Sequence, residues 1–174
     1  MSRPVRVGVS ACLLGQNVRY DGGHKRDDVV MGLASRSIEL VPVCPEVEVG
    51  LGTPREPIQL QRDGGLVRLV APGSGKDHTA AMRRFAEERV RALGELDLCG
   101  YVLKKDSPSC GVERVPVWSG HEMARDGRGA FAAVLMELLP RLPVVEESAL
   151  RDPLLREDFL ARVVAYGRTR AGET

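Results

Sequence analysis

The chain has 174 residues, 43% hydrophobic and 28% charged, a composition typical of globular proteins. A chain of this length can bury roughly 70% of its unfolded surface, so it needs no disulfide or metal merely to stay folded. Twenty-five basic residues against 24 acidic ones leave a net charge of +1, which argues against a broad duplex-DNA footprint. Aromatic residues make up only 4%, which argues equally against a platform for stacking single-stranded bases.

The sequence indicates neither a membrane-spanning segment nor a secretory leader. No apolar run approaches the roughly 20 residues that a membrane helix needs. Residues 1–4 (Met-Ser-Arg-Pro) lead directly into a β-branched run, without the apolar stretch of a signal peptide. We therefore expect a cytoplasmic protein without a membrane partner, whose four cysteines stay reduced and form no disulfides.

The first part of the chain predicts two strands joined by a loop and a short helix. Residues 5–9 form a β-branched run that predicts a strand, and the polar, glycine-punctuated residues 10–23 predict a loop. Two aspartates at 27–28 predict the start of a short helix that ends at Ala34. Ile38–Val43 predicts the second strand.

The middle of the chain predicts a β-hairpin and then the strongest helix. Residues 58–61 and Leu66–Val70 flank residues 62–65 (Arg-Asp-Gly-Gly), a typical hairpin pattern. Residues 77–93 predict a helix, because apolar residues recur on one face while arginine and glutamate fill the other. The apolar face consists of Met82, Phe85, Ala86, Val90 and Leu93.

The last part of the chain predicts strands and helices in alternation. Leu98–Leu103 predicts a strand and residues 104–111 a loop, and residues 130–139 predict a helix. Residues 144–145 predict a short strand, and residues 153–166 predict a closing amphipathic helix. The expected apolar stripe of this last helix consists of Leu155, Phe159, Leu160, Val163 and Val164.

These elements predict an α/β fold with a mainly parallel sheet flanked by helices, Rossmann-like and doubly wound, in which the β-hairpin is an insertion. No repeat, low-complexity tract or linker interrupts the sequence, so we expect one domain over residues 1–174. Chemistry in such folds gathers in loops beyond the carboxyl ends of the strands.

Three of the four cysteines follow predicted strands. Cys12 follows the first strand, Cys44 the second, and Cys110 lies in the loop after Leu98–Leu103. Glycine, proline and serine surround these three, so packing gives no reason for a thiol there. Cys99 lies inside a strand pattern and is expected in the core, as a small buried hydrophobe.

Three convergent thiolates suit two kinds of metal site. One is a zinc ion with an open coordination position, and the other is a 4Fe–4S cluster with one iron not bound by protein. The absence of a Cys-x-x-Cys pair excludes standard zinc ribbons and two-cluster ferredoxins. In either kind of site, the open position is where a substrate would bind.

Three other motifs fail on spacing or residue type. A phosphate-cradling cysteine nucleophile needs one residue fewer than the six that separate Cys12 from Arg19. Residues 72–76 (Pro-Gly-Ser-Gly-Lys) lack the first glycine of a phosphate loop, and Asp77 replaces its Ser or Thr. His121-Glu122 lacks both the spacing and the later cysteine pair of zinc deaminases.

Charged residues beside the cysteines are candidates for acid–base chemistry. Glu46 and Glu48 follow Cys44 closely, and a carboxylate in a partly enclosed loop beside a metal can act as general acid or base. Lys104 and Lys105 are of a type that ordinarily faces solvent, but beside a polyanionic cluster one of them could offset its charge.

Three motifs together resemble the 2-thiouracil desulfidase family, formerly a domain family of unknown function. The first is residues 10–15 (Ser-Ala-Cys-Leu-Leu-Gly) with residues 18–22 (Val-Arg-Tyr-Asp-Gly). The second is residues 44–47 (Cys-Pro-Glu-Val) with Gly50-Leu51 and Pro54-Arg55, and the third is Lys104 with residues 107–111 (Ser-Pro-Ser-Cys-Gly). They come in the family's order, and the resemblance runs from about residue 5 to residue 111.

The resemblance implies a 4Fe–4S cluster held by Cys12, Cys44 and Cys110. The family's two catalytic side chains, a Glu after the second ligand cysteine and a Ser before the third, map onto Glu46 and Ser107. Ser109 is the other candidate for this serine, and Cys99 matches no family ligand. Substrate contacts are expected from Ser10, Tyr20, Asp21, Arg55, Lys104 and Ser109.

The activity that the resemblance implies is removal of sulfur from 2-thiouracil or a related thiolated pyrimidine, giving uracil and hydrogen sulfide without net redox change. The iron that lacks a protein ligand would bind the substrate's sulfur, and Glu46 would activate a water for attack on the ring carbon. Ser107 would relay a proton or hold the ring.

The expected partner is therefore a small thiolated pyrimidine and not DNA. A thiolated nucleotide or tRNA stays open as the substrate, and the loop residues that would bind its phosphates are Arg19, Lys25, Arg26 and Arg55. Two alternatives also stay open: another cysteine-based sulfur-transfer enzyme, and a non-catalytic metal- or cluster-binding protein.

Overall fold

Four parallel strands form the first of two sheets in the computed structural model, which describes residues 3–172. Positions 1–2 and 173–174 of the predicted domain lie outside the described residues. The strands are β1 (Val5–Ser10), β2 (Ile38–Val43), β5 (Leu98–Leu103) and β8 (Val144–Glu146), in the order β2-β1-β5-β8. Because β1 lies between β2 and β5, the strand order reverses there, and doubly wound folds bind their ligands beyond such a point.

The centre of this sheet is fully buried. All six residues of β5 are buried, as expected for a strand covered on both faces. Gly8 pairs with Tyr101 across β1 and β5. A Cβ at Gly8 would lie 2.5 Å from two carbons of the Tyr101 ring, so the ring can pack there only because position 8 is glycine.

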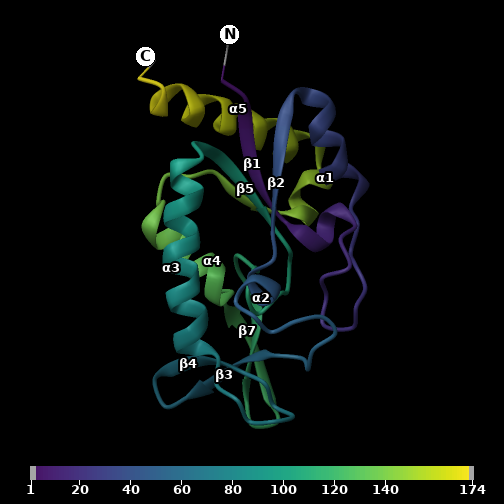
Figure 1. The fold of residues 1–174 in the computed structure, drawn as a ribbon, viewed down its shortest axis with the longest axis vertical. Helices are drawn as coiled ribbons and strands as arrows, with labels where there is room; N and C mark the ends of the chain where they lie inside the picture. The colour runs from purple at the N-terminus through teal and green to yellow at the C-terminus, as the bar shows by residue number, and fades with distance from the viewer. Residues whose placement is uncertain (1–2, 173–174) are drawn as a thin grey trace.

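Helices cover both faces of the first sheet (Figure 1). One face packs against α1 (Asp28–Gly32), α5 (Pro153–Arg170) and the short 3-10 helices η1 (Ala11–Leu14), η2 (Leu33–Arg36) and η3 (Glu147–Arg151). The other face packs against α3 (Thr79–Glu95) and α4 (Ala130–Leu138). The predicted α/β fold with a parallel sheet flanked by helices is confirmed.

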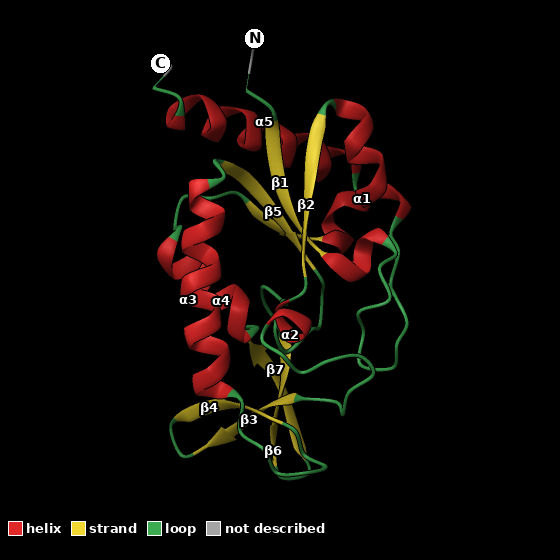
Figure 2. Cartoon of the chain, in the orientation of Figure 1, coloured by secondary structure: helices red, strands yellow, loops and turns green. Residues whose placement is uncertain are grey.

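A second sheet lies at the end of α3 remote from α5 (Figure 2). It consists of β3 (Gln59–Asp63), β4 (Leu66–Val70), β6 (Val115–Ser119) and β7 (Glu122–Gly127), in the order β4-β3-β6-β7. The β3–β4 hairpin is the one that the sequence predicts, and β3 pairs in parallel with β6. The hairpin lies between β2 and β5 in the chain and outside the parallel sheet, as predicted for an insertion, and it forms the second sheet together with β6 and β7.

The β6–β7 hairpin escaped prediction for two physical reasons. Pro116 lies inside β6, and proline is normally depleted from strands because it cannot donate to the ladder. The residues of β7 are almost all exposed, so they lack the period-two alternation of a half-buried strand.

The helix boundaries differ from the prediction by a few residues. The short helix extends from Asp28 through η2 to Arg36, and Oδ1 of Asp27 accepts hydrogen bonds from the Val29 and Val30 N–H groups at its start. The strongest helix runs over Thr79–Glu95, two residues later than predicted at each end. Two further helical turns, η1 and α2 (Pro45–Glu48), lie in segments predicted as loops.

The closing helix is longer and less amphipathic than predicted. It ends at Arg170, and its buried residues are Phe159, Leu160 and Val163. Leu155 and Val164 of the predicted apolar stripe are 51% and 42% exposed, so the stripe is narrower than the sequence suggests.

Cys99 is 6% exposed and packs in the core between the first sheet and α5, as predicted. Along residues 3–172, no helix combines the length and apolar character needed to cross a membrane.

Candidate functional site

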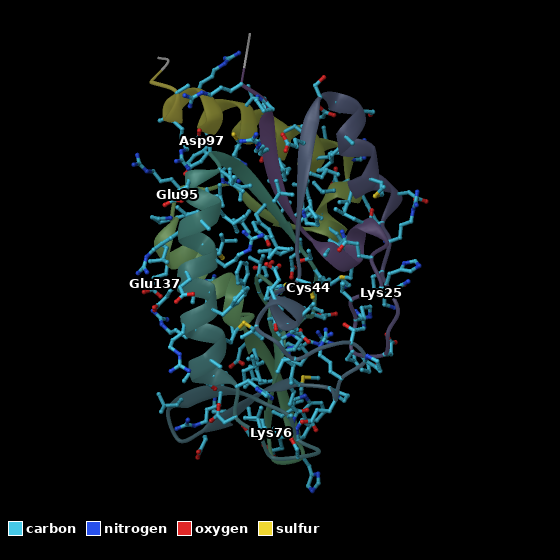
Figure 3. All side chains as sticks on the ribbon, in the orientation of Figure 1. Lys25, Cys44, Lys76, Glu95, Asp97 and Glu137 are labelled. Carbon is cyan, nitrogen blue, oxygen red and sulfur yellow. The ribbon has the colours of Figure 1, made fainter. Side chains whose placement is uncertain are left out.

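The carboxyl ends of β1, β2 and β5 bring three cysteines to the wall of one cavity of about 310 Å³. Cys12 lies in η1 directly beyond β1, Cys44 follows β2, and Cys110 lies in the loop after β5. Figure 3 labels Cys44 in the middle of the molecule and Lys25, another residue of the cavity wall. Residues far apart in sequence thus share a site because three neighbouring parallel strands end at the same edge.

A tight turn fixes Cys12. Gly15 ends η1 with a φ of +84°, a left-handed conformation that favours glycine. The N–H of Gly15 donates to the Cys12 carbonyl oxygen at 3.2 Å, and the N–H of Lys25 donates to the same oxygen at 2.9 Å. Gly15 and Lys25, on opposite sides of the first loop, are therefore both hydrogen-bonded to the backbone of Cys12.

Cys44 is the residue that precedes helix α2. Pro45 occupies the first helical position, where the missing N–H of proline costs nothing. The Cys44 N–H donates to Oε2 of Glu48 at 2.9 Å, and Oε1 of Glu48 accepts from Nε of Arg89 at 2.8 Å. This chain of contacts anchors Cys44 to α3, and its thiol contacts the Val18 carbonyl oxygen at 3.8 Å.

The start of α4 supports the loop that carries Cys110. The Ala130 and Phe131 N–H groups donate to the carbonyl oxygens of Pro108 and Ser109, each at 2.9 Å. A Cβ at Gly129 would lie 2.5 Å from the carbonyl carbon and oxygen of Ser109. Because Gly129 has no side chain, the backbone of the loop packs directly against the N-terminal end of α4.

Burial raises the pKa of all three thiols of the cavity. For Cys12 it raises the pKa to about 11, although the positive charges of Arg19 and Lys104 lower it. Burial also raises the pKa of Cys44, against hydrogen bonds from the backbone near Val47, and the pKa of Cys110, against a hydrogen bond from the Ser10 hydroxyl. Burial therefore favours the neutral thiol over the thiolate at all three positions.

Glu46 lies in α2 with both carboxylate oxygens occupied. Nε of Arg55 donates to Oε1 at 3.1 Å, and the Ser109 hydroxyl donates to Oε2 at 3.0 Å. The side chains of Arg55 and Glu46 are only 6% and 15% exposed. Glu46 is therefore a nearly buried carboxylate whose orientation is fixed from two sides at the cavity wall.

The two serines of the third motif have different partners. Oγ of Ser107 accepts hydrogen bonds from the Ser109 N–H at 3.2 Å and the Cys110 N–H at 3.0 Å. A hydroxyl oxygen can accept two hydrogen bonds, so the Ser107 hydroxyl can form a further hydrogen bond only as a donor. Ser107 lines the cavity. Ser109 is fully buried and contacts Glu46, and it is not among the lining residues.

Ser10 and Lys104 belong to a network at the other side of the cavity. Oγ of Ser10 accepts from the Lys104 N–H at 3.0 Å, and its hydroxyl also bonds the Cys110 side chain. Nζ of Lys104 lies 2.8 Å from Oε1 of Glu147, the first residue after β8. Ser10 and Lys104 both line the cavity. Ser10 is only 2% exposed, because these protein groups surround its side chain.

The first loop closes the outer side of the cavity. Tyr20 lines it and is 41% exposed, and the Tyr20 carbonyl oxygen accepts from the Arg55 N–H at 2.8 Å. Asp21 is not among the lining residues, and its Oδ1 accepts from the N–H of Gly23 within the loop. The structure therefore brings nine of the eleven predicted site residues to the cavity wall, and the other two, Ser109 and Asp21, do not line it.

The cavity offers a donor set suited to a sulfur-ligated cofactor. Cys12, Cys44 and Cys110 are free thiols, and thiolates favour zinc or iron–sulfur clusters. Across residues 3–172, no group of three or more His, Cys, Asp or Glu side chains is arranged to hold a single metal ion. A 4Fe–4S cluster offers each ligand a separate iron, and its thiolates need not converge on one point.

Sequence reasoning missed two features of this site. Glu147 was not singled out, although it follows a fourth parallel strand as the cysteines follow the other three, and this position is the signal that could have found it. The partners of Glu46 were missed as well, because Arg55 and Ser109 come from loops whose paths the sequence pattern does not specify.

Comparisons with known proteins find matches that cover most of this chain. The model of a family described as 2-thiouracil desulfurase matches residues 7–147. The uncharacterized protein YbbK of Bacillus subtilis (strain 168) is 31% identical over 153 residues, which span 84% of this chain and 98% of YbbK. Among solved structures, a 4Fe–4S-dependent thiouracil desulfidase, TudS, matches with a TM-score of 0.67 and 33% identity, covering 88% of this chain and 98% of TudS.

Proposed function

The chain belongs to the 2-thiouracil desulfurase family, and from that premise we propose that it removes sulfur from a small thiolated pyrimidine such as 2-thiouracil. Water would replace the sulfur, so that the products are uracil and hydrogen sulfide and no net oxidation or reduction occurs. The observation that carries the proposal is the cavity that Cys12, Cys44 and Cys110 share with Glu46 and Ser107.

The proposed cofactor is a 4Fe–4S cluster held by Cys12, Cys44 and Cys110. The donor set supports it, and so does the likeness to a desulfidase named as 4Fe–4S-dependent. When bound, the cluster would supply one iron without a protein ligand, a Lewis acid for the substrate's sulfur.

Glu46 is the proposed general base. Arg55 and Ser109 hold its carboxylate in one orientation, with both of its oxygens accepting hydrogen bonds. A carboxylate fixed in this way can take a proton from a water molecule in the cavity while that water attacks the ring carbon that bears sulfur. Arg55 and Ser109, which the motifs suggested as substrate contacts, would then act through Glu46.

Ser107 is the proposed hydrogen-bond donor to the substrate. Its oxygen already accepts from two backbone N–H groups, so its own O–H is oriented away from them. Such a hydroxyl can donate to the pyrimidine ring or pass a proton toward the departing sulfur. Tyr20, at the outer wall, is proposed to contact the ring, and Asp21 to contribute through the same loop.

The rest of the proposal concerns the setting of the reaction. We assign the activity to one iron–sulfur desulfidase domain over residues 1–174, and to the cytoplasm, where thiols are kept reduced. The substrate is a small molecule, with a thiolated nucleotide or tRNA as the larger form to be compared with the free base.

A direct assay tests this function. The protein is loaded with iron and sulfide without oxygen, and then incubated with 2-thiouracil or 4-thiouracil while released sulfide and uracil are measured. Equal amounts of sulfide and uracil, formed repeatedly by each protein molecule, are expected for at least one of these bases. Retention of the cluster without sulfide release would instead identify a cluster-binding protein, and sulfur transferred onto a protein thiol would identify a sulfurtransferase.

A further inference from the structure

A nearly buried ion pair joins the ends of β5 and β8. Nζ of Lys104 lies 2.8 Å from Oε1 of Glu147, and the two side chains are 19% and 9% exposed. Oε2 of Glu147 accepts from the Lys105 N–H at 2.7 Å. One carboxylate thus binds two consecutive residues of the loop that leads to Cys110, which fixes where the Lys104 ammonium lies.

Lys104 is one of the residues that line the cavity, whereas Glu147 is not. Nζ also donates to the Lys105 carbonyl oxygen at 2.9 Å. An ammonium carries three N–H groups, so these two acceptors, the ones found within residues 3–172, leave one N–H of Lys104 that can donate to a bound molecule. The positive charge of Lys104 reaches the cysteines, since it lowers the pKa of Cys12 against the effect of burial.

Other cations of the cavity wall are less suited to this task. Arg55 pairs with Glu46, which itself lines the cavity, so its charge offsets that of the proposed base. Lys25 and Lys105 are exposed, where water screens their charge. Arg19 is half-buried, but its guanidinium lies over the ring of the adjacent tyrosine. Lys104 combines low exposure with a position fixed by an anion behind it.

This inference rests on the proposed function, in which negative charge develops in the cavity during the reaction. As water adds to the ring carbon, the carbon–sulfur bond breaks and its electron pair leaves with the sulfur, which then takes up a proton. We propose that Lys104 stabilises the departing sulfur through a charge-assisted hydrogen bond, and that Glu147 is the residue that positions Lys104. The donor is in place before the reaction, so little reorganisation is needed when the charge develops.

The pair is hard to explain by folding alone. Burying two charges carries a large desolvation penalty, and apolar residues of similar volume often serve a fold equally well. An ion pair whose cation belongs to a residue of the cavity wall, in a cavity that three cysteines also line, has a use that an apolar pair would lack.

The test compares four full-length, iron-loaded proteins: the wild type, Lys104→Met, Glu147→Gln and the double variant. Hydrosulfide is titrated into each while the visible absorption of the cluster is followed, and kcat and KM are measured with 2-thiouracil. Lys104→Met is expected to weaken hydrosulfide binding by about 10-fold or more and to lower kcat more than it raises KM. Glu147→Gln is expected to act in the same direction by a smaller factor.

The double variant and two further variants separate positioning from general stability. If Glu147 acts through Lys104, then Glu147→Gln has no additional effect in the Lys104→Met background. Lys104→Arg is expected to restore most of the hydrosulfide affinity. Glu157→Gln breaks an exposed ion pair, Arg36–Glu157 at 2.7 Å, and is expected to match the wild type in iron content and hydrosulfide affinity.

The outcomes distinguish this inference from the proposed function. A wild type that turns over 2-thiouracil beside a Lys104→Met variant with unchanged kcat and hydrosulfide affinity would overturn the inference and leave the function intact. Additive effects of the two substitutions would overturn the positioning role of Glu147. A wild type that releases no sulfide from any thiolated base would overturn the function and, with it, the role of Lys104 at a departing sulfur, whatever the hydrosulfide affinity of Lys104→Met.

Discussion

Ser109 donates a 3.0 Å hydrogen bond from its hydroxyl to Oε2 of Glu46, although 63 positions separate the two residues in sequence. The contact joins the loop after β5 to the helix after β2, and Arg55 holds the other carboxylate oxygen. A carboxylate in this arrangement has few rotamers open to it. Its orientation is the property on which the proposed proton transfer depends.

Replacing Glu46 by glutamine should separate catalysis from cofactor binding. Glutamine can still accept from Arg55 and donate to Ser109, so the fold and the iron content are expected to stay as in the wild type. Turnover of 2-thiouracil should fall by roughly 100-fold or more, the usual scale for loss of a general base. Glu56→Gln, an exposed glutamate outside the cavity wall, is the control. Unchanged turnover in Glu46→Gln would remove Glu46 from the mechanism.

The two serines of the third motif should respond differently to alanine. Ser107→Ala removes the hydroxyl that faces the cavity and should lower kcat by about 100-fold. Ser109→Ala removes one of two groups that hold Glu46, so a smaller loss is expected, together with a decrease of about 1–3 kcal/mol in the free energy of unfolding. Steady-state kinetics and urea unfolding of both variants show which serine is catalytic. A larger loss of kcat in Ser109→Ala than in Ser107→Ala would make Ser109 the catalytic serine.

Removal of single cysteines should show which ones hold the cluster. Cys110→Ala is expected to lose the cluster, measured as iron per chain and as visible absorption after oxygen-free loading. Cys99→Ala is the matched control, because Cys99 packs in the core between the first sheet and α5 and should keep both iron and turnover. Loss of iron from Cys99→Ala alone would contradict the ligand assignment.

Alanine at Gly129 should disturb the loop that carries Cys110. The new Cβ would lie 2.5 Å from backbone atoms of Ser109, which cannot move aside as a flexible side chain can. A loss of about 1–3 kcal/mol in unfolding free energy and a lower iron content are expected. Gly32→Ala is the control, since nothing lies within 4 Å of that position in α1 and alanine there should stabilise the protein by about 0.5–1 kcal/mol. Equal stability of the two variants would show that the loop gives way easily.

Asp77 should make the stability depend on pH in acid. Hydrogen bonds from the Thr79 side chain and N–H, and then the charge of Arg68, hold the pKa of Asp77 below its usual 3.8. Because the folded value is the lower one, Asp77 contributes stability that is fully present above pH 3.8 and is lost as the pH falls through the folded pKa. Urea unfolding of the wild type and Asp77→Asn at neutral and acid pH should therefore give curves that converge in acid. A constant difference between them would refute this account.

Much of the fold follows from the sequence because its signals are local. The β-branched runs predict β1, β2 and β5, and the apolar face of residues 77–93 predicts α3. The β6–β7 hairpin could not be predicted from the sequence, because the exposed strand β7 is specified by its pairing with β6 and not by burial of its own side chains.

The candidate site, like the fold, could be predicted from the sequence only in part. The convergence of Cys12, Cys44 and Cys110 follows from strand ends that the sequence makes visible. The hydrogen bonds of Glu46 and the contact of Lys104 with Glu147 depend on loop conformations and on the place of β8 in the sheet, and no short motif encodes them.

The exposed strand β7 bears on how the protein behaves at high concentration. It is the last strand of the second sheet, so its outer side offers unpaired backbone groups to which another chain could add. Glu122, Arg125 and Asp126 spread both signs of charge along it, and Asp106 and Arg62 hold the latter two by contacts of 3.0 and 3.1 Å. Charges on an edge discourage strand addition between molecules, which favours a preparation that stays free of aggregates at the concentrations that spectroscopy requires.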